Sequence, residues 1–445
     1  MLNVLRHPVY LRLFSAQAIA LLGTGLMTIA LGLLAFELAG ESAGAVLGTA
    51  YAIKMVAYVG FSPVASALVA HLPRKAVLIA ADLLRAATAV FLPFITEVWQ
   101  IYLLIFVLQL ASATFTPAFQ ATIPDVLRKE EDYTRALSLS RLLYDLENLI
   151  SPALAGLLLT IMGFHWLFGG TVVGFLVSAL LVLGAAIPAA APSKKDRGFR
   201  DRLTRGSRIY LATPRLRGLL ALTLVGAASS AFVIVNTVVL VRAGFGFGDG
   251  QVAYALAAYG GGSMLVALSL PWLLARMSER SVMIAAGVLL AAVTLGQGVY
   301  MVVVGLFSWS VLLGLWALMG GLYSAVLTPA GRLLRNSAHA NDRPALFAAQ
   351  FALSHVCWLA TYPIAGWVGQ AFGLGVAMLL LGSVAVFGAG LALVVWRRES
   401  GEILAHGHPE LPTDHPHLKG HGAQPGQHRH AFVIDDEHRR WPTNG

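Results

Sequence analysis

The segment 192–202 reads PSKKDRGFRDR, and it lies near the middle of the chain between two long apolar regions. Basic residues continue beyond it at Arg205, Arg208, Arg215 and Arg217, so nine lysines and arginines fall between 192 and 217. The apolar regions on its two sides resemble each other. The segment is therefore typical of a basic connector between two copies of one unit.

An internal repeat supports this interpretation, with three matches at a nearly constant offset of about 210 residues. The matching segments are 70–81 with 275–286, 116–118 with 328–330, and 151–156 with 362–366. Both copies run in the same sense, which indicates parallel repeats about an axis along the membrane normal. We predict four parts, namely a six-helix bundle (1–191), a connector (192–214), a second six-helix bundle (215–398) and a tail (399–445).

The composition excludes a water-soluble fold. Of the 445 residues, 57% are hydrophobic and 12% are charged, whereas soluble domains carry about 25% charged residues. A membrane-spanning helix needs about 20 mostly apolar residues. Twelve stretches qualify, so we predict an all-α membrane protein with two parallel six-helix repeats: 13–36, 44–70, 76–96, 99–120, 137–163, 166–189, 215–241, 250–275, 281–304, 308–331, 345–371 and 374–396.

The distribution of Lys and Arg predicts the orientation. Basic residues cluster at the N-terminus, in alternate loops, in the connector and after Arg397, whereas the opposite loops carry only Arg242. Positively charged loops stay in the cytoplasm. We therefore expect both termini to be cytoplasmic in an inner membrane. This bias also explains the net charge of +9 without a nucleic-acid partner.

The stretch 137–163 divides into a polar and an apolar half when it is drawn as a helix, which indicates one wet face. Charged residues inside a membrane usually face an aqueous cavity and handle ions or protons. We predict that Glu147 carries proton or cation coupling, although structural pairing is the alternative. The polar half contains Ser138, Ser140, Arg141, Tyr144, Asp145, Glu147, Asn148, Ser151 and Pro152, with Arg141 and Asp145 spaced to form an ion pair.

Lys54 lies about ten residues into the second stretch, roughly 15 Å deep at 1.5 Å per residue. Two placements are open, because its side chain can extend to the membrane surface or pair with Glu147. Gln17 and Thr24 form a polar stripe on the first stretch, together with Thr28. This stripe lines the pathway or bonds neighbouring helices.

The eleventh stretch contains His355 and Cys357, which are two further cavity candidates. They lie about 200° apart around a helix, so they cannot bind one metal ion from the same helix. Cys357 is the only cysteine, so the chain has no intramolecular disulfide and no multi-thiolate metal cluster.

The tail after residue 398 is polar and rich in histidine. Imidazoles with some carboxylates suit nickel, cobalt, zinc or copper(II), so we predict metal binding there. The segment 432–441 is less polar, and we expect it to dock on the cytoplasmic face. The eight candidate ligands are His406, His408, His415, His417, His421, His428, His430 and His438.

Twelve spans in two parallel repeats with a basic central loop resemble the major facilitator superfamily. The loop 66–75 is similar to the loop signature of that family only at Arg74 and Lys75. The segment SPALAG at 151–156 resembles the antiporter signature, with small residues in place of glycines, which implies export by proton antiport. The His-rich tail resembles that of the NreB-type nickel-resistance exporters, which implies that the tail collects metal.

The sequence favours a proton-coupled exporter of a divalent metal, nickel or cobalt, that works as a monomer. A multidrug or siderophore exporter is one alternative, and a cavity rich in aromatic and aliphatic residues would favour the drug exporter. A membrane metal sensor without transport is another alternative. No catalytic or cofactor-binding motif is evident, so we predict neither an enzyme nor a resident cofactor.

Overall fold

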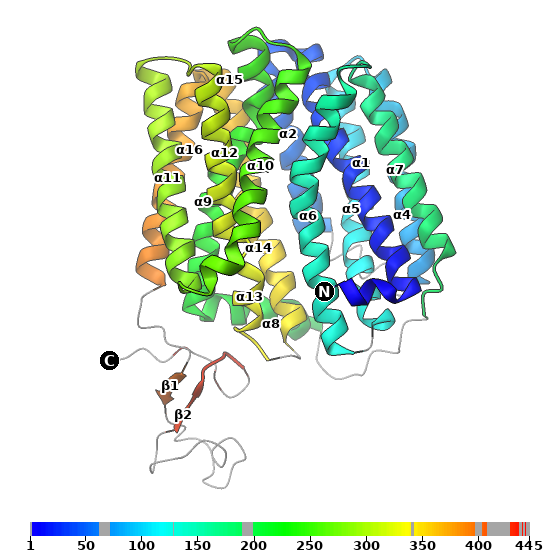
Figure 1. Ribbon diagram of the computed structural model, residues 1–445, viewed down its shortest axis with the longest axis vertical. Coiled ribbons are helices and arrows are strands. Elements are labelled where there is room, and N and C mark those ends of the chain that lie inside the picture. Colours follow the sequence, from blue (N-terminus) through cyan, green and yellow to red (C-terminus); the bar gives the residue numbers. More distant parts are fainter. Residues whose placement is uncertain are drawn as a thin grey trace.

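The chain folds into a bundle of long helices, shown by a computed structural model (Figure 1). The start of α1, the connector helix α8 and the two tail strands lie at one end of the bundle, which we call the connector end. The opposite end, where α15 lies, is the far end. The structure describes residues 2–61, 72–127, 129–188, 199–339, 342–396, 403–406, 428–435, 438 and 441.

Six α-helices lie among the described residues of the first half. One of them, α5, begins with a capping box in which Glu97 and Gln100 satisfy each other's backbone N–H groups. The elements are η1 (Leu2–Arg6), α1 (Pro8–Ala39), η2 (Gly40–Ser42), α2 (Ala43–Val56), the π-helical turn η3 (Ala57–Phe61), α4 (Arg74–Phe91), η4 (Leu92–Phe94), α5 (Val98–Val126), α6 (Glu130–Leu158) and α7 (His165–Gly184).

The second half repeats this plan after the connector helix and ends in two short strands. Its elements are α8 (Phe199–Ala212), α9 (Pro214–Val239), the π-helical turn η5 (Leu240–Gly244), α10 (Asp249–Leu274), α11 (Glu279–Val303), α12 (Trp309–Leu327), α13 (Ala330–Arg335), α14 (Arg343–Pro363), the π-helical turn η6 (Ile364–Val368), α15 (Gly369–Phe372), α16 (Leu374–Val395), β1 (Ile403–His406) and β2 (His428–Ala431).

Helix packing is repeated in the two halves. In the first half α7 packs against α1 and α4, and in the second half the corresponding helix α16 packs against α9 and α11. An ion pair at the connector end is also repeated, with its charges exchanged. Arg74 at the start of α4 pairs with Asp125, whereas Glu279 at the start of α11 pairs with Arg332.

The membrane character predicted from composition is confirmed. The described residues contain ten helical stretches long and apolar enough to cross a membrane, and the first, Pro8–Phe61, contains both α1 and α2. The span expected at 137–163 falls on α6, which is not among the ten and carries Arg141, Asp145 and Glu147. Large apolar side chains such as Phe94, Ile161 and Val303 remain more than 70% exposed, as a lipid-facing surface requires.

The two halves meet along two helix pairs, α6 with α10 and α2 with α14. The largest core cluster extends across this junction and contains side chains from both halves, including Leu47 and Tyr51 of α2 and Tyr362 of α14. The charged helix α6 therefore lies at the boundary between the halves.

The basic connector contains a helix that belongs to the packing of the second half. The guanidinium of Arg205 in α8 donates to both carboxylate oxygens of Asp342, at 2.6 and 2.9 Å, and both side chains are buried. Tyr210 of the same helix donates to Gln350 of α14. Gly206 lies so close to α14 that a Cβ atom there would overlap the Ala345 backbone. These contacts hold α8 against α14, so the connector end of the second half is a packed surface.

The end of the tail docks on this surface, whereas the cytoplasmic location of the surface stays a prediction. Phe432 and Ile434 are each 3% exposed and join a core cluster with residues of α8 and α9. Trp441 lies near Arg215 of α9, with 5.9 Å between the guanidinium carbon and the ring centre. The backbone N–H of His438 donates a hydrogen bond of 2.7 Å to the Asp435 carboxylate. The strands β1 and β2, which the sequence analysis did not predict, form an antiparallel pair just before this anchor.

Replacing Arg205 with alanine should destabilise the protein, because the Asp342 carboxylate loses a buried ionic partner. Removing one member of such a pair costs about 3–5 kcal/mol. We expect the thermal unfolding midpoint of the purified protein in detergent to fall by several degrees. Arg217→Ala is the control, since Arg217 is basic, exposed and nearby on α9. Equal midpoints for the two variants would contradict a structural role for the Arg205–Asp342 pair.

Candidate functional site

A group of polar and aromatic side chains lies between the halves, and we call it the central cluster: Lys54, Tyr58, Glu147, Phe351 and His355. The first three come from α2, η3 and α6 of the first half, and the last two come from α14 of the second half. Lys54 is close enough to Glu147 and His355 for its charge to act on both.

Aromatic contacts hold the central cluster together across the boundary. The Tyr58 ring centre lies 5.6 Å from that of Phe351 and 5.1 Å from that of His355. The Lys54 ammonium lies 6.0 Å from the Tyr58 ring centre. His355 Nδ1 lies 2.6 Å from the Phe351 carbonyl oxygen, so this nitrogen carries the proton when the ring is neutral. The Nε2 atom is then the one left with a free lone pair.

A row of five aromatic side chains lies next to the central cluster, one helix turn away along α2 and α14, and we call it the aromatic strip. Neighbouring ring centres lie between 5.0 and 6.5 Å apart, which are normal distances for aromatic pairs. The Tyr259 hydroxyl ends the row with a 2.6 Å hydrogen bond to Ser230. The strip therefore joins four helices from both halves: Tyr51 of α2, Trp358 and Tyr362 of α14, Tyr323 of α12, and Tyr259 of α10.

Beyond the aromatic strip, the two halves touch backbone to backbone at the far end. A Cβ atom on Gly48 would lie 2.7 Å from the Tyr362 carbonyl oxygen, and one on Gly366 would lie 2.4 Å from the Gly44 carbonyl oxygen. Such distances leave no room for any side chain. Trp367 adds a hydrogen bond of 2.9 Å to Thr49. The site is therefore closed toward the far end by the contact of α2 with α14 and η6.

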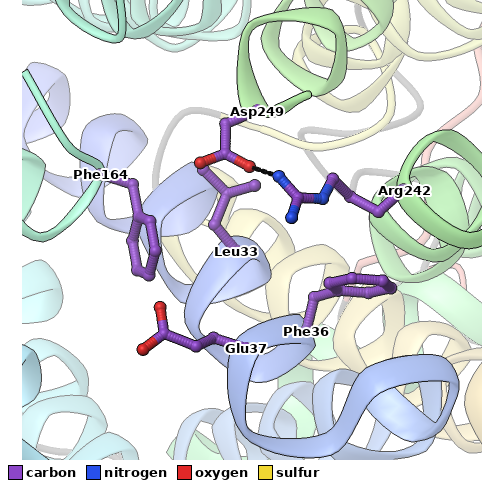
Figure 2. Close-up of a pocket in the computed structure, with 6 residues that line it drawn as sticks. All are labelled: Leu33, Phe36, Glu37, Phe164, Arg242 and Asp249. Carbon is purple, nitrogen blue, oxygen red and sulfur yellow. Dashed lines mark hydrogen bonds and ion pairs between the residues drawn. The ribbon is translucent and has the colours of Figure 1, made fainter. Parts of the chain in front are cut away.

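A small cavity of about 230 Å³ lies at the far end, away from the central cluster (Figure 2). Its wall includes an ion pair between Arg242 and Asp249, and the Arg242 guanidinium carbon lies 5.3 Å from the Phe36 ring centre. Because Arg242 and Phe36 belong to different halves, this contact adds to the closure. We place the candidate site at the central cluster, where charged side chains of one half meet aromatic side chains of the other.

Several residues predicted from the sequence make helix-packing contacts. Gln17 is buried and accepts a hydrogen bond from Ser140 at 3.3 Å. The Thr24 hydroxyl donates to its own helix, at the Ala20 carbonyl. Ser151 packs on Gly25, where a Cβ atom would overlap its hydroxyl group. Gln17 and Ser151 therefore connect α1 with α6, whereas Thr24 bonds within α1, and none of the three belongs to the central cluster.

Other predicted residues remain untested. The side chains of Arg141, Tyr144, Asp145 and Asn148 lie outside the described residues, so the expected Arg141–Asp145 pair stays a prediction. Cys357 is partly buried with a free thiol. Of the eight tail histidines, only His438 has a described side chain. It is 4% exposed with Nδ1 2.9 Å from Asp435, so it acts as an anchor residue.

The sequence analysis missed the aromatic residues of the site, because an aromatic residue in a membrane helix is normally read as lipid-facing or core. The spacing of Tyr51, Lys54 and Tyr58 was the available signal, since these residues share one helix face. It also missed the buried pair of Asp82 and Arg85, which lies within the first half. Ser178 donates to Asp82 at 2.7 Å, so this pair joins α4 to α7.

A family model described as "Major Facilitator Superfamily" matches residues 13–298. The chain belongs to this superfamily. Two of its known structures have the same fold. The nucleoside transporter NupG superposes with a TM-score of 0.64 at 16% identity, covering 88% of this chain and 100% of NupG. A bacterial homologue of the human lysosomal transporter Spinster gives 0.67 at 13% identity, covering 87% and 96%.

Curated relatives are more similar in sequence than these structures and include efflux proteins. Macrolide efflux protein A of Streptococcus pyogenes is 27% identical over 221 residues, which is 48% of this chain and 53% of that protein. The chain thus spans about half the length of this relative. The uncharacterized MFS-type transporter YfiS of Bacillus subtilis is 22% identical over 384 residues, covering 84% of this chain and 90% of YfiS.

Replacing Gly366 with alanine should open the far end. The added Cβ atom would overlap the backbone of α2, so the closed arrangement becomes unfavourable relative to one in which the halves separate there. The measurement is labelling of a cysteine at Val239, which is 6% exposed at this junction, by a maleimide in a Cys357→Ser background. We expect faster labelling in Gly366→Ala. Gly314→Ala is the control, because nothing lies within 4 Å of that position.

If Gly366→Ala and Gly314→Ala label at the same rate, then the glycine contact does not hold the far end closed.

Proposed function

We propose that this protein is a secondary exporter that moves a bulky, largely apolar organic molecule out of the cell in exchange for protons. The observation that carries the proposal is the aromatic strip, which begins at the Tyr51–Tyr362 contact between the halves, extends into the second half, and lies one helix turn from the central cluster along α2 and α14. Aromatic faces and a few polar groups are the usual lining of sites for organic ligands. The efflux relatives support the direction of transport.

The position of the aromatic strip is consistent with transport by alternating access. In this superfamily's repeat architecture, the two halves rock around a site at their interface. Tyr51 belongs to one half and Tyr362 to the other, and their rings are in contact, so a substrate bound against this pair touches both halves at once. The far end is closed by the glycine contact. With the connector end in the cytoplasm, as the positive charges predict, substrate would load from the cytoplasm.

Glu147 is the group that would couple this movement to protons. Carboxylates inside a membrane bundle commonly carry protons in transporters. Glu147 interacts with Lys54 of the same half, and Lys54 also acts on His355 of the other half. A proton on Glu147 removes its negative charge, and it thereby changes the electrostatic force between α2, α6 and α14. Proton arrival would then favour one arrangement of the halves over the other.

Nickel or cobalt export is the second candidate function, and the eight tail histidines favour it. The described membrane helices give metal export less support, because no group of three or more His, Cys, Asp or Glu side chains that could hold a metal ion is found among the described residues. The relatives reported above include macrolide efflux proteins and give no support for a metal substrate. Metal export therefore remains a prediction, and organic export has the better-placed site.

Glu147→Gln should abolish proton-driven export, because glutamine keeps the size and hydrogen bonding of the side chain but cannot titrate. The host is a strain that lacks its own exporters, tested on a panel of macrolides, other apolar drugs, nickel and cobalt. We expect the unaltered protein to raise resistance to at least one organic compound and Glu147→Gln to lose at least about 90% of that gain, at equal membrane abundance.

Glu41→Gln is the matched control, because Glu41 is an exposed carboxylate at the far end. Full resistance in Glu147→Gln would refute the coupling role. Resistance to nickel or cobalt alone would replace the organic proposal with the metal one. In that case, replacing the tail histidines other than His438 with asparagine should reduce resistance mainly at low metal concentration, because the tail then raises the local concentration.

A further inference from the structure

Lys54 lies between two contacts that join the halves of the molecule. Tyr51, one turn earlier on α2, meets Tyr362 with 5.0 Å between ring centres. Tyr58, one turn later, meets His355 with 5.1 Å between ring centres. The Lys54 ammonium itself lies 6.0 Å from the Tyr58 ring centre. The ammonium is therefore held inside the candidate transport site, and the alternative placement at the membrane surface is not the one seen.

The groups around this ammonium are those that bind organic cations. Aromatic faces attract a positive charge, most strongly where water is scarce. The Glu147 carboxylate supplies an opposite charge that interacts with Lys54. Glu147 also packs near Gly25 of α1, where a Cβ atom would lie 3.4 Å from its Cγ atom. The Glu147 side chain is thus packed against α1, and its carboxylate is close enough to Lys54 for their charges to interact.

We propose that Lys54 is a specificity-determining residue that occupies the cation position of the site, so that the transporter accepts neutral apolar molecules and rejects permanently charged organic cations. A cationic molecule entering the aromatic strip would meet the like charge of Lys54. Such repulsion is strong in a partly desolvated site, because neither water nor salt screens it well. A neutral molecule of the same shape is not repelled by the charge of Lys54.

This inference rests on the proposed function, since Lys54 can select among organic molecules only if they occupy this site. Removing the charge of Lys54 should leave the Glu147 carboxylate and the aromatic faces available to an incoming cation. Lys54→Gln should therefore convert a site for neutral molecules into one that also binds cations. The gain depends on Glu147, so it should disappear when Glu147 is replaced as well.

The test uses the full-length protein in lipid nanodiscs and two probes of similar shape, the cation tetraphenylphosphonium and the neutral triphenylphosphine oxide. Equilibrium dialysis measures the binding of each. We expect the unaltered protein to bind the neutral probe more tightly. Lys54→Gln should strengthen binding of the cation by at least about 10-fold, which corresponds to about 1.4 kcal/mol. Binding of the neutral probe should change by less than about 3-fold.

Lys54→Arg is the matched control, because it keeps the positive charge, and it should still discriminate against the cation. Lys54→Gln combined with Glu147→Gln should lose the gain. Equal preference for the two probes in the unaltered protein would overturn the inference, and this measurement does not depend on any variant folding. An unchanged ratio in a folded Lys54→Gln would also overturn it. If the unaltered protein binds neither probe, the proposed function fails together with the inference.

Discussion

The structure depends on one constraint, which is the absence of water in the hydrocarbon layer of a membrane. A backbone group there that lacks a hydrogen bond costs several kcal/mol, so the chain crosses as complete helices. Charged side chains obey the same constraint. The Asp82–Arg85 pair is buried among three helices of the first half, with Arg85 between the rings of Phe115 and Phe175 at 4.2 and 4.5 Å. This ion pair therefore belongs to the first half alone, and other charged side chains lie at the boundary between the halves.

The boundary between the halves has two different kinds of contact. At the far end, glycines allow the backbones of α2 and η6 to touch, and this contact tolerates no added atom. Toward the middle of the boundary, aromatic rings and the charged side chains of Lys54 and Glu147 take the place of backbone contact. Backbone contact suits a seal that is either closed or open. Large flat side chains suit a site that must release one molecule and accept the next, since they offer contact area without one fixed geometry.

At the connector end of the second half, the helical part of the connector, α8, packs against the bundle. Arg205 and Asp342 fix α8 to α14, and Phe432 and Ile434 bring the end of the tail to the same surface. Basic residues in this region therefore have two roles. Their positive charge predicts that this end of the protein lies in the cytoplasm. Arg205 and Arg215 also make specific contacts, with Asp342 and with the Asn336 carbonyl at 2.6 Å.

The sequence by itself determined the all-helical membrane fold, the repeat and the central importance of α6. Composition, span length and periodicity are local properties, and the bilayer imposes them on each helix separately. Glu147 and Lys54 were found in this way, because a charge in an apolar stretch is costly wherever the helix lies. Only the tertiary structure decided that Lys54 lies near enough to Glu147 of a neighbouring helix in the same half to act on its charge, and that Tyr51 meets Tyr362 of the other half. These distances depend on how helices pack within one bundle and between two bundles, which no single helix encodes.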